Sequence, residues 1–334
     1  MKKTLVKGMG SPISGGRVYL VEDKERHEFR KEYYDVHVRY YVCEDTGERF
    51  TDEKQDELFC NELYNQYRIK HGLPFPDEIK SIRERYRLNF TQITKLAGFG
   101  QNQWRHYEEG SVPSESNGRI IVALSDKQCA LNLLASCSEA FSVKEYNEVK
   151  SRISESSNNT HSDVKAFLFY GKQKRDYWNG YSALNADKLE DMVRYFVGNG
   201  VSFKTKLNKC LFYSDMLNYR RYGCSISGAR YRAIQYGPVP EHYDTIYDNV
   251  DGIYKTIEFL YDKDTETLHT KKTESSHLSD LELAIIKMVL KRFDGLTARE
   301  VVDLSHKESV WEKHKDGHEL IPYSDSFDLT LFQD

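Results

Sequence analysis

The spacing of apolar side chains predicts long helices in the second half of the chain. Five of them share one face of a helix over residues 186–198: Leu189, Met192, Val193, Phe196 and Val197. The same period recurs over residues 205–221 and 278–293. Ser279 stands where the last of these helices needs an N-cap, because its hydroxyl group can accept a hydrogen bond from the first turn. This part of the chain is therefore expected to be mostly helical.

Two further elements are expected near the C-terminus. Thr297 and Glu300 have the spacing of a capping box, which predicts a helix running from there towards His306. Residues 253–260 and 266–270 are rich in alternating and β-branched side chains, and they predict a hairpin. The C-terminal domain is therefore expected to combine helices with a small β element.

The N-terminal pattern is different. Alternating aromatic and β-branched positions predict strands over 17–20, 28–35 and 37–42. Thr51 can cap the helix that follows. That helix has an apolar face made of Leu58, Phe59, Leu63, Tyr64 and Tyr67. A small β-rich unit followed by a helix is expected here.

Several short helices are predicted next. Residues 77–86 form the first, 91–97 the second, and 101–107 the third, with a glycine-containing turn at 98–100. The third helix is rich in Gln, Asn and Arg, whose side chains can read base edges in the major groove of DNA. A short helix, a turn and such a second helix are typical of a helix-turn-helix. A helical bundle without DNA affinity is the alternative explanation.

These elements predict a multidomain, mainly α chain that is α+β overall. The expected domains are a β-rich unit over 1–73, a helix-turn-helix over 74–126, a helical segment with a polar linker over 127–176, and a C-terminal domain over 177–334. A chain of 334 residues is longer than one hydrophobic core usually organises, which agrees with several domains.

Composition narrows the class of protein. The formal net charge of −4 excludes a uniformly basic coat for nucleic acid. No run approaches the roughly 20 apolar residues of a membrane helix, and the N-terminus lacks the apolar core of a signal peptide. The six cysteines are far apart and form no C-x-x-C pair, as expected for reduced thiols. A cytoplasmic protein without contact to a membrane is predicted.

Enzymatic chemistry is not indicated. The segment from Gly198 to Thr205 resembles a phosphate loop, but Phe203 occupies the position of the second glycine. Gly223 to Gly228 does not match a nucleophile elbow, and no H-E-x-x-H motif occurs. We therefore expect no catalytic residue, no cofactor and no metal, and a hydrolase or nuclease stays as the least favoured alternative.

The predicted helix-turn-helix resembles the Cro/repressor type. The resemblance is carried by Leu88, Thr91, Gln92, Ala97, Gly98, Trp104, Tyr107, Glu108 and Gly110. Within that type it is most similar to the antitoxin family called MqsA, whose base-reading Asn and Arg fall on Asn102 and His106. The implied DNA-contacting residues are Gln92, Gln101, Asn102, Gln103, Arg105 and His106. Palindromic operators imply a homodimer on double-stranded DNA.

The β-rich unit also resembles the N-terminal zinc finger of that family, except at the metal. The family has two C-x-x-C pairs, whereas here Cys43 remains near the second pair and Thr46 stands where its partner would be. The resemblance therefore implies a finger fold that has replaced zinc by packing of its side chains.

The C-terminal domain looks like the SocA-like, or Panacea, domain of antitoxins and phage-encoded proteins. The matching blocks are 206–215, 226–233, 236–240 and 304–306, followed by Trp311. The resemblance implies a non-enzymatic module that recognises a protein, often a toxin, and sometimes acts as a proteolytic adaptor. The candidate partner-binding residues are Lys206, Lys209, Tyr213, Asp215, Arg220, Arg221, Arg230, Arg232, Tyr236 and Pro238.

Charge adds one observation to that resemblance. Residues 204–232 contain seven bases and one acid, Asp215, so this segment could meet an acidic partner or nucleic acid. A solvated face that is balanced by acids elsewhere is the alternative.

Together these features predict a type II antitoxin that neutralises a cognate toxin and represses its own operon. A phage or mobile-element regulator whose C-terminal domain binds a host protein is the alternative.

Overall fold

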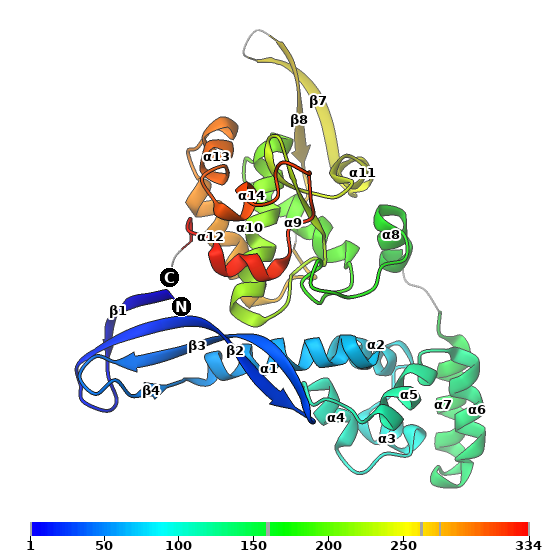
Figure 1. The fold of residues 1–334 in the computed structure, drawn as a ribbon. Coiled ribbons are helices and arrows are strands. Elements are labelled where there is room, and N and C mark those ends of the chain that lie inside the picture. The colour runs from blue at the N-terminus through cyan, green and yellow to red at the C-terminus, as the bar shows by residue number, and fades with distance from the viewer. Residues whose placement is uncertain (1, 158–160, 261–262, 274, 333–334) are drawn as a thin grey trace. The chain divides into compact units, whose positions relative to one another are not determined.

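The fold is α+β, as expected (Figure 1). It was obtained as a computed structural model, which describes residues 2–157, 161–260, 263–273 and 275–332. Two compact units can be distinguished. The first comprises Met1–Asp23, Val38–Phe59 and His161–Asp334, and the second comprises Lys24–His37 and Cys60–Thr160. The expected boundary at residue 177 therefore falls inside the first unit.

A four-stranded sheet forms the N-terminal part, with the order β1-β2-β3-β4. Its strands are β1 (Lys2–Gly10), β2 (Arg17–Phe29), β3 (Glu32–Cys43) and β4 (Arg49–Phe50). Lys3 lies opposite Val21, and Tyr41 lies opposite Phe50, both in antiparallel pairs. The sequence pattern did not predict β1, whose lysines and glycines give little strand signal.

The predicted strand over 28–35 is wrong, because the chain reverses direction in the middle of it. Arg30 and Lys31 join β2 to β3 with positive φ angles of 50° and 66°. Two successive residues with positive φ are typical of the two-residue turns whose twist suits a hairpin. Asn and Gly usually occupy such turns, so Arg and Lys gave no turn signal.

Seven helices of the described residues follow the sheet. They are α1 (Glu53–His71), α2 (Pro76–Arg85), α3 (Phe90–Ala97), α4 (Gln103–Glu108), α5 (Glu115–Leu124), α6 (Lys127–Ser136) and α7 (Val143–Glu155). A 3₁₀ turn, Ser138–Ala140, precedes α7. The polar stretch predicted as a linker therefore begins inside α7, and residues 158–160 lie outside the described part.

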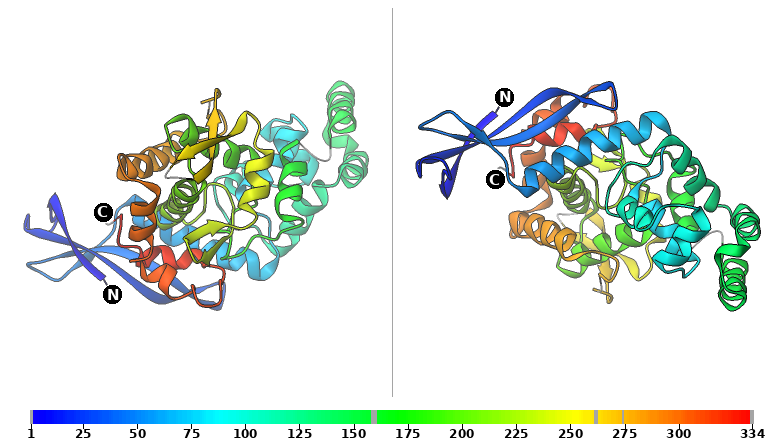
Figure 2. Two further views of the ribbon diagram at one scale, coloured as in Figure 1. Left: turned by 90° about the horizontal axis from the view of Figure 1, so that it is seen from above. Right: turned by 90° about the horizontal axis from the view of Figure 1, so that it is seen from below.

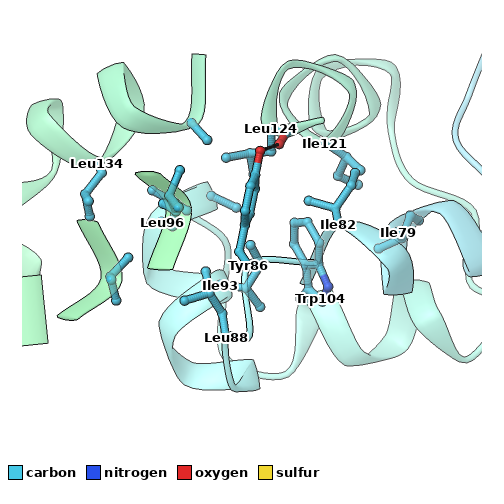
Figure 3. Packing of buried hydrophobic residues seen from close by; sticks show 14 of the residues in the cluster. Ile79, Ile82, Tyr86, Leu88, Ile93, Leu96, Trp104, Ile121, Leu124 and Leu134 are labelled. Atoms are coloured by element: carbon cyan, nitrogen blue, oxygen red, sulfur yellow. Dashed lines mark hydrogen bonds between the residues drawn. The ribbon is translucent and has the colours of Figure 1, made fainter. Parts of the chain in front are cut away.

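The helices α2 to α7 share one core (Figure 3). Ile79, Tyr86, Ile93, Trp104 and Leu124 are each completely buried in it, and the Tyr86 hydroxyl group donates a hydrogen bond to the Leu124 carbonyl oxygen at 2.9 Å. This core gives the predicted helix-turn-helix a rigid support.

The C-terminal part contains helices and two small sheets. The helices are α8 (His161–Tyr170), α9 (Ala186–Gly198), α10 (Lys204–Tyr222), α11 (Tyr243–Asn249), α12 (Asp280–Phe293), α13 (Ala298–Ser305) and α14 (Ser309–Glu312). The strands are β5 (Tyr231–Ile234), β6 (Gly237–Pro240), β7 (Ile253–Leu260) and β8 (Lys263–Thr270). A 3₁₀ segment, Tyr323–Asp328, follows α14.

The helix α10 is the centre of this part. It packs against α9, α12, α13 and β6, and in the view from above it lies in the middle of the C-terminal helices (Figure 2, left). Buried residues run along its length from Leu207 to Arg220. A helix that is covered on all sides has no polar face, so its charged side chains must find partners inside the protein.

The local signals for helix ends are confirmed. Ser279 and Glu282 form a capping box at the start of α12, and Thr297 and Glu300 form one at the start of α13. Within the described residues, no helix is both long enough and apolar enough to cross a membrane.

Candidate functional site

The predicted helix-turn-helix consists of α3 and α4. The Asn89 side chain caps α3 by accepting a hydrogen bond from the Gln92 backbone N–H at 2.9 Å. The helix ends at Gly98, whose φ of 67° lies in the left-handed region that glycine adopts without strain. The turn to α4 is therefore built by local backbone chemistry.

The second helix of this motif is shorter than predicted. It begins at Gln103 and not at Gln101, because Asn102 takes a left-handed conformation with a φ of 64°. Asn102 is thus the N-cap residue, and its carbonyl oxygen accepts a hydrogen bond from the His106 N–H at 3.0 Å. Asn is one of the few residues besides glycine that visit this conformation routinely.

The side chains of this segment divide into two groups. Trp104 and Tyr107 are buried, as a supporting core requires. Four predicted DNA-contacting residues are exposed: Gln101, Asn102, Arg105 and His106. Gln103 is half-buried. The exposed group has the polar, hydrogen-bonding character that reading base edges needs.

Ion pairing holds α4 in place. The Glu108 carboxylate accepts hydrogen bonds from Arg83 Nε at 2.7 Å and from Arg83 Nη2 at 2.9 Å. It also accepts one from Trp104 Nε1 at 2.8 Å. A bidentate arginine–carboxylate pair fixes direction as well as distance. The Arg105 guanidinium lies 4.7 Å from the centre of the Phe90 ring, which orients that exposed cation.

Gln92, the first of the implied DNA-contacting residues, is buried. Its side chain is only 6% exposed, and its carbonyl oxygen accepts hydrogen bonds from the Asn89 N–H at 3.2 Å and from Arg152 at 3.4 Å. These bonds complete a capping box. The role of the Gln92 side chain in this structure is therefore structural.

The C-terminal part contains a buried carboxylate, Asp215, on α10. It accepts hydrogen bonds from the backbone N–H groups of Ile226 and Ser227, each at 2.8 Å, and from the Tyr231 hydroxyl group at 2.6 Å. The Ser227 hydroxyl group donates another at 2.5 Å. Burial raises the pKa of Asp215, and these hydrogen bonds oppose that shift. Asp215 thus fixes the segment between α10 and β5.

Lys209 is the second buried charged residue of α10. Its ammonium group donates a hydrogen bond to the Tyr236 carbonyl oxygen, and burial lowers its pKa to about 7. The turn it contacts needs glycine at position 237, where φ is 90°. A Cβ atom there would lie 2.6 Å from the Ser305 hydroxyl oxygen and 2.7 Å from Lys209 Cε. The Tyr236-Gly237 turn thus packs closely against the Lys209 side chain.

Arg220 is also an internal residue. It is 5% exposed, donates a hydrogen bond to the Phe332 carbonyl oxygen at 3.1 Å, and lies 3.4 Å from the Glu22 carboxylate. These contacts connect α10 with β2 and with the end of the chain inside the first unit. The Arg220 guanidinium thus stabilises the fold through contacts inside the protein.

Five of the candidate partner-binding residues are therefore not surface residues. Each of the following is buried: Lys209, Tyr213, Asp215, Arg220 and Pro238. The expectation that their side chains present a contact surface is wrong, because α10 is covered on all sides and Pro238 lies on β6 beside it. Composition alone did not reveal this.

The other cations of this segment are mostly satisfied within the chain. Arg230 lies 2.7 Å from Asp176, and Arg232 lies 2.7 Å from Glu241. Lys206 donates a hydrogen bond to the Leu296 carbonyl oxygen at 2.7 Å, and Arg221 lies 3.7 Å from the Met288 sulfur. Four of the seven bases in residues 204–232 thus pair with acids elsewhere in the chain: Lys204, Arg220, Arg230 and Arg232. Lys209 and Arg220 are buried, so the segment is not a solvated basic face.

Exposed apolar residues, not cations, distinguish the surface of this part. Tyr236 is 61% exposed, and Ile257 and Phe259 on β7 are 75% and 71% exposed. The alternation in residues 253–260 does place Ile257 and Phe259 on one face of a strand. The sequence signal was available, but an apolar strand residue is normally expected to be buried.

The described residues contain no group of three or more His, Cys, Asp or Glu side chains that could hold a metal ion. Cys43 is completely buried, and its sulfur lies 3.2 Å from the Ser14 hydroxyl oxygen. Hydrogen bonds from the hydroxyl groups of Ser11, Ser14 and Thr46 lower the pKa of this thiol to about 6.

Comparison with known protein families gives a match for this region. Residues 207–312 match the family model described as "Antitoxin SocA-like, Panacea domain". The match begins in α10 and ends with α14. Neither the curated proteins nor the solved structures yielded a match. The similarity to the SocA-like Panacea domain is thereby confirmed for residues 207–312, which contain Asp215, Lys209, the Tyr236-Gly237 turn and the β7–β8 hairpin.

Proposed function

We propose that this protein is an antitoxin that neutralises a cognate toxin by binding it and represses its own operon through α3 and α4. The proposed neutralisation of a toxin rests on the match of residues 207–312 to the antitoxin SocA-like Panacea domain. A domain of this kind is typically non-enzymatic, and its function lies in what its surface binds.

The chemistry of the C-terminal part supports a binding role. Its buried ionisable groups, Asp215 and Lys209, make hydrogen bonds to the backbone or to neighbouring hydroxyl groups. A general acid or base needs access to a substrate proton, which a side chain with no exposed surface does not have. Protein recognition by exposed side chains is therefore the better-supported activity.

The proposed DNA binding is supported by the exposed side chains of α4 and of the segment before it. Gln101, Asn102, Arg105 and His106 are exposed, while Trp104 is buried beneath them. We further propose a homodimer, because repressors of this type read two half-sites of a palindrome. We also propose that the N-terminal sheet and α1 are a finger-like unit of the MqsA kind that has lost its metal. The four proposed domains are those expected from the sequence.

Co-expression tests the antitoxin role directly. The gene next to that of this protein would be induced alone, with the wild-type chain, and with the Asp215→Ala variant as a control for loss of the C-terminal fold. We expect the neighbouring product alone to stop growth, the wild type to restore it, and Asp215→Ala to fail. A harmless neighbouring product would show that the antitoxin proposal is wrong.

A further inference from the structure

The β7–β8 hairpin projects from the C-terminal helices (Figure 1). Its register pairs Ile257 with Glu266 and Phe259 with Asp264. These four side chains lie on the same face of the two-stranded sheet, because residues directly opposite each other share a face. The distal half of that face is thus an apolar pair flanked by two carboxylates.

The opposite face of the hairpin is polar. The Thr267 hydroxyl group donates a hydrogen bond to the Glu258 carboxylate at 2.9 Å and lies 2.9 Å from the Thr256 hydroxyl group. His269 Nε2 lies 3.2 Å from the same carboxylate. This network links four polar side chains of that face to one another: Thr256, Glu258, Thr267 and His269. The two faces therefore differ in kind, and Ile257 and Phe259 on the distal half of the apolar face are left exposed within the described residues.

The base of the hairpin is anchored to the helices. The Leu268 N–H donates a hydrogen bond to the Ser202 carbonyl oxygen at 2.8 Å, and the Leu268 side chain is completely buried. Lys204 at the start of α10 lies 2.7 Å from Glu266 and 2.8 Å from Asp244. A partner that binds the distal half would therefore meet a surface that is already ordered, which lowers the entropic cost of association.

We infer that this protein binds its protein partner with the distal half of the apolar face of β7–β8. Ile257 and Phe259 enter an apolar pocket of that partner, and Asp264 meets a lysine or arginine side chain at the pocket's rim. The inference rests on the proposed antitoxin function and names the recognition surface for it.

Three observations favour such an occupant. Large apolar side chains that are more than 70% exposed gain most when a partner removes them from water. The exposed Asp264 carboxylate beside them favours a basic rim and disfavours nucleic acid, whose phosphates it would repel. The hairpin also lies within residues 207–312, the part that matches an antitoxin domain.

The test uses the full-length chain and, as the probe, the purified product of the neighbouring gene. The main variant is the double substitution Ile257→Ser with Phe259→Ser, and Asp264→Lys is a second, separate variant. Leu281→Ser on α12 is the matched control, because Leu281 is 59% exposed and lies outside the hairpin. Calorimetry measures binding, circular dichroism verifies folding, and growth measures neutralisation.

We expect the double variant to fold normally and to bind the probe about 100-fold more weakly, because buried aromatic anchors dominate interface energies. Asp264→Lys should weaken binding by about fivefold at low salt and by less at high salt, since salt screens exposed charges. Leu281→Ser should bind within about twofold of the wild type, as surface substitutions away from an interface do.

Two results would overturn the inference. The first is a double variant that binds and neutralises as well as the Leu281→Ser control. The second is a wild-type dimer that the double variant separates into monomers without loss of neutralisation, which would assign this face to a second copy of the chain. A neighbouring product that is harmless and does not bind the wild type would instead refute the antitoxin function on which the inference rests.

Discussion

The Asp215 carboxylate accepts a hydrogen bond from the Tyr231 hydroxyl group at 2.6 Å, and both side chains are completely buried. Asp215 belongs to α10 and Tyr231 begins β5, so this bond joins the central helix to the first strand of the small β element. A buried carboxylate is tolerated here because four donors surround it.

Asp215→Ala should therefore lower the free energy of unfolding by about 3 kcal/mol or more, because it leaves several buried donors without an acceptor. Tyr231→Phe removes one donor and should cost about 1–2 kcal/mol. Urea unfolding of the two variants measures both values. Tyr236→Phe, at a residue that is 61% exposed, is the control and should change little. Equal effects of all three substitutions would contradict this account.

Lys209 makes the stability of the fold depend on pH. Burial lowers its pKa to about 7 in the folded chain, whereas an exposed lysine titrates near 10.4. Between these values the unfolded chain binds more protons, so the contribution of Lys209 to stability is fully present above about pH 10 and is lost as the pH falls through 7. Lys209→Met should flatten this dependence and stabilise the fold at pH 7.

Unfolding curves at pH 7, 8 and 9 test the prediction for Lys209. Lys206→Met is the control, because the Lys206 side chain is half-exposed on the same helix. The free energy of unfolding of the wild type should rise from pH 7 to 9 more than that of Lys209→Met. Equal pH dependence of the two proteins would rule out a buried amine as the cause.

The turn between β2 and β3 contains backbone strain at Lys31 that a substitution can relieve. Lys31 is exposed and has a φ of 66°, which a side chain with a Cβ disfavours. Lys31→Gly should raise the free energy of unfolding by about 1 kcal/mol, after the entropy that glycine gains in the unfolded chain is subtracted. Lys31→Ala keeps the Cβ and should not stabilise. Thermal unfolding separates the two, and a stabilising Ala would show that removal of the charge matters instead.

Readout of DNA should depend on Asn102. Because φ is 64° there, Asn102→Gly removes the amide without adding backbone strain, which Ala would do. We expect the affinity for the promoter of its own operon to fall by about 1–3 kcal/mol and the affinity for scrambled DNA to stay the same. Fluorescence anisotropy at about 0.15 M salt measures both. Asn132→Ala, at an exposed residue of α6, is the control.

Gln92→Ala should behave differently from Asn102→Gly. Since Gln92 completes the capping box of α3, its loss should reduce stability by about 1 kcal/mol. Its effect on DNA should follow from that loss of stability and not from a lost phosphate contact. A wild type that binds the promoter no better than scrambled DNA would mean that α3 and α4 act as a scaffold.

The N-terminal unit should be stable without zinc. Purified protein is expected to contain far less than one zinc ion per chain by elemental analysis, because Cys43 has no nearby set of ligands in the described residues. Cys43→Ser should leave the metal content unchanged. Stoichiometric zinc that disappears in Cys43→Ser would show that this unit is a true metal site.

Local signals in the sequence determined much of the secondary structure. The helix predicted over 186–198 has those bounds in the structure, and the caps at Ser279 and Thr297 lie where their spacing placed them. Such elements could be predicted because a helix face and a capping box depend on residues within a few positions of each other. The composition that predicts the hairpin over 253–270 is also local.

Only the tertiary structure decided which charged and apolar residues lie inside. Lys209 and Arg220 counted as a basic surface in the sequence, yet both are buried, because α10 is covered by elements far away in the chain. Ile257 and Phe259 are apolar residues of a predicted strand, yet they are exposed, whereas Leu268 on the same face is buried against the helices. Burial depends on contacts between distant segments, and no pattern within one segment contains that information.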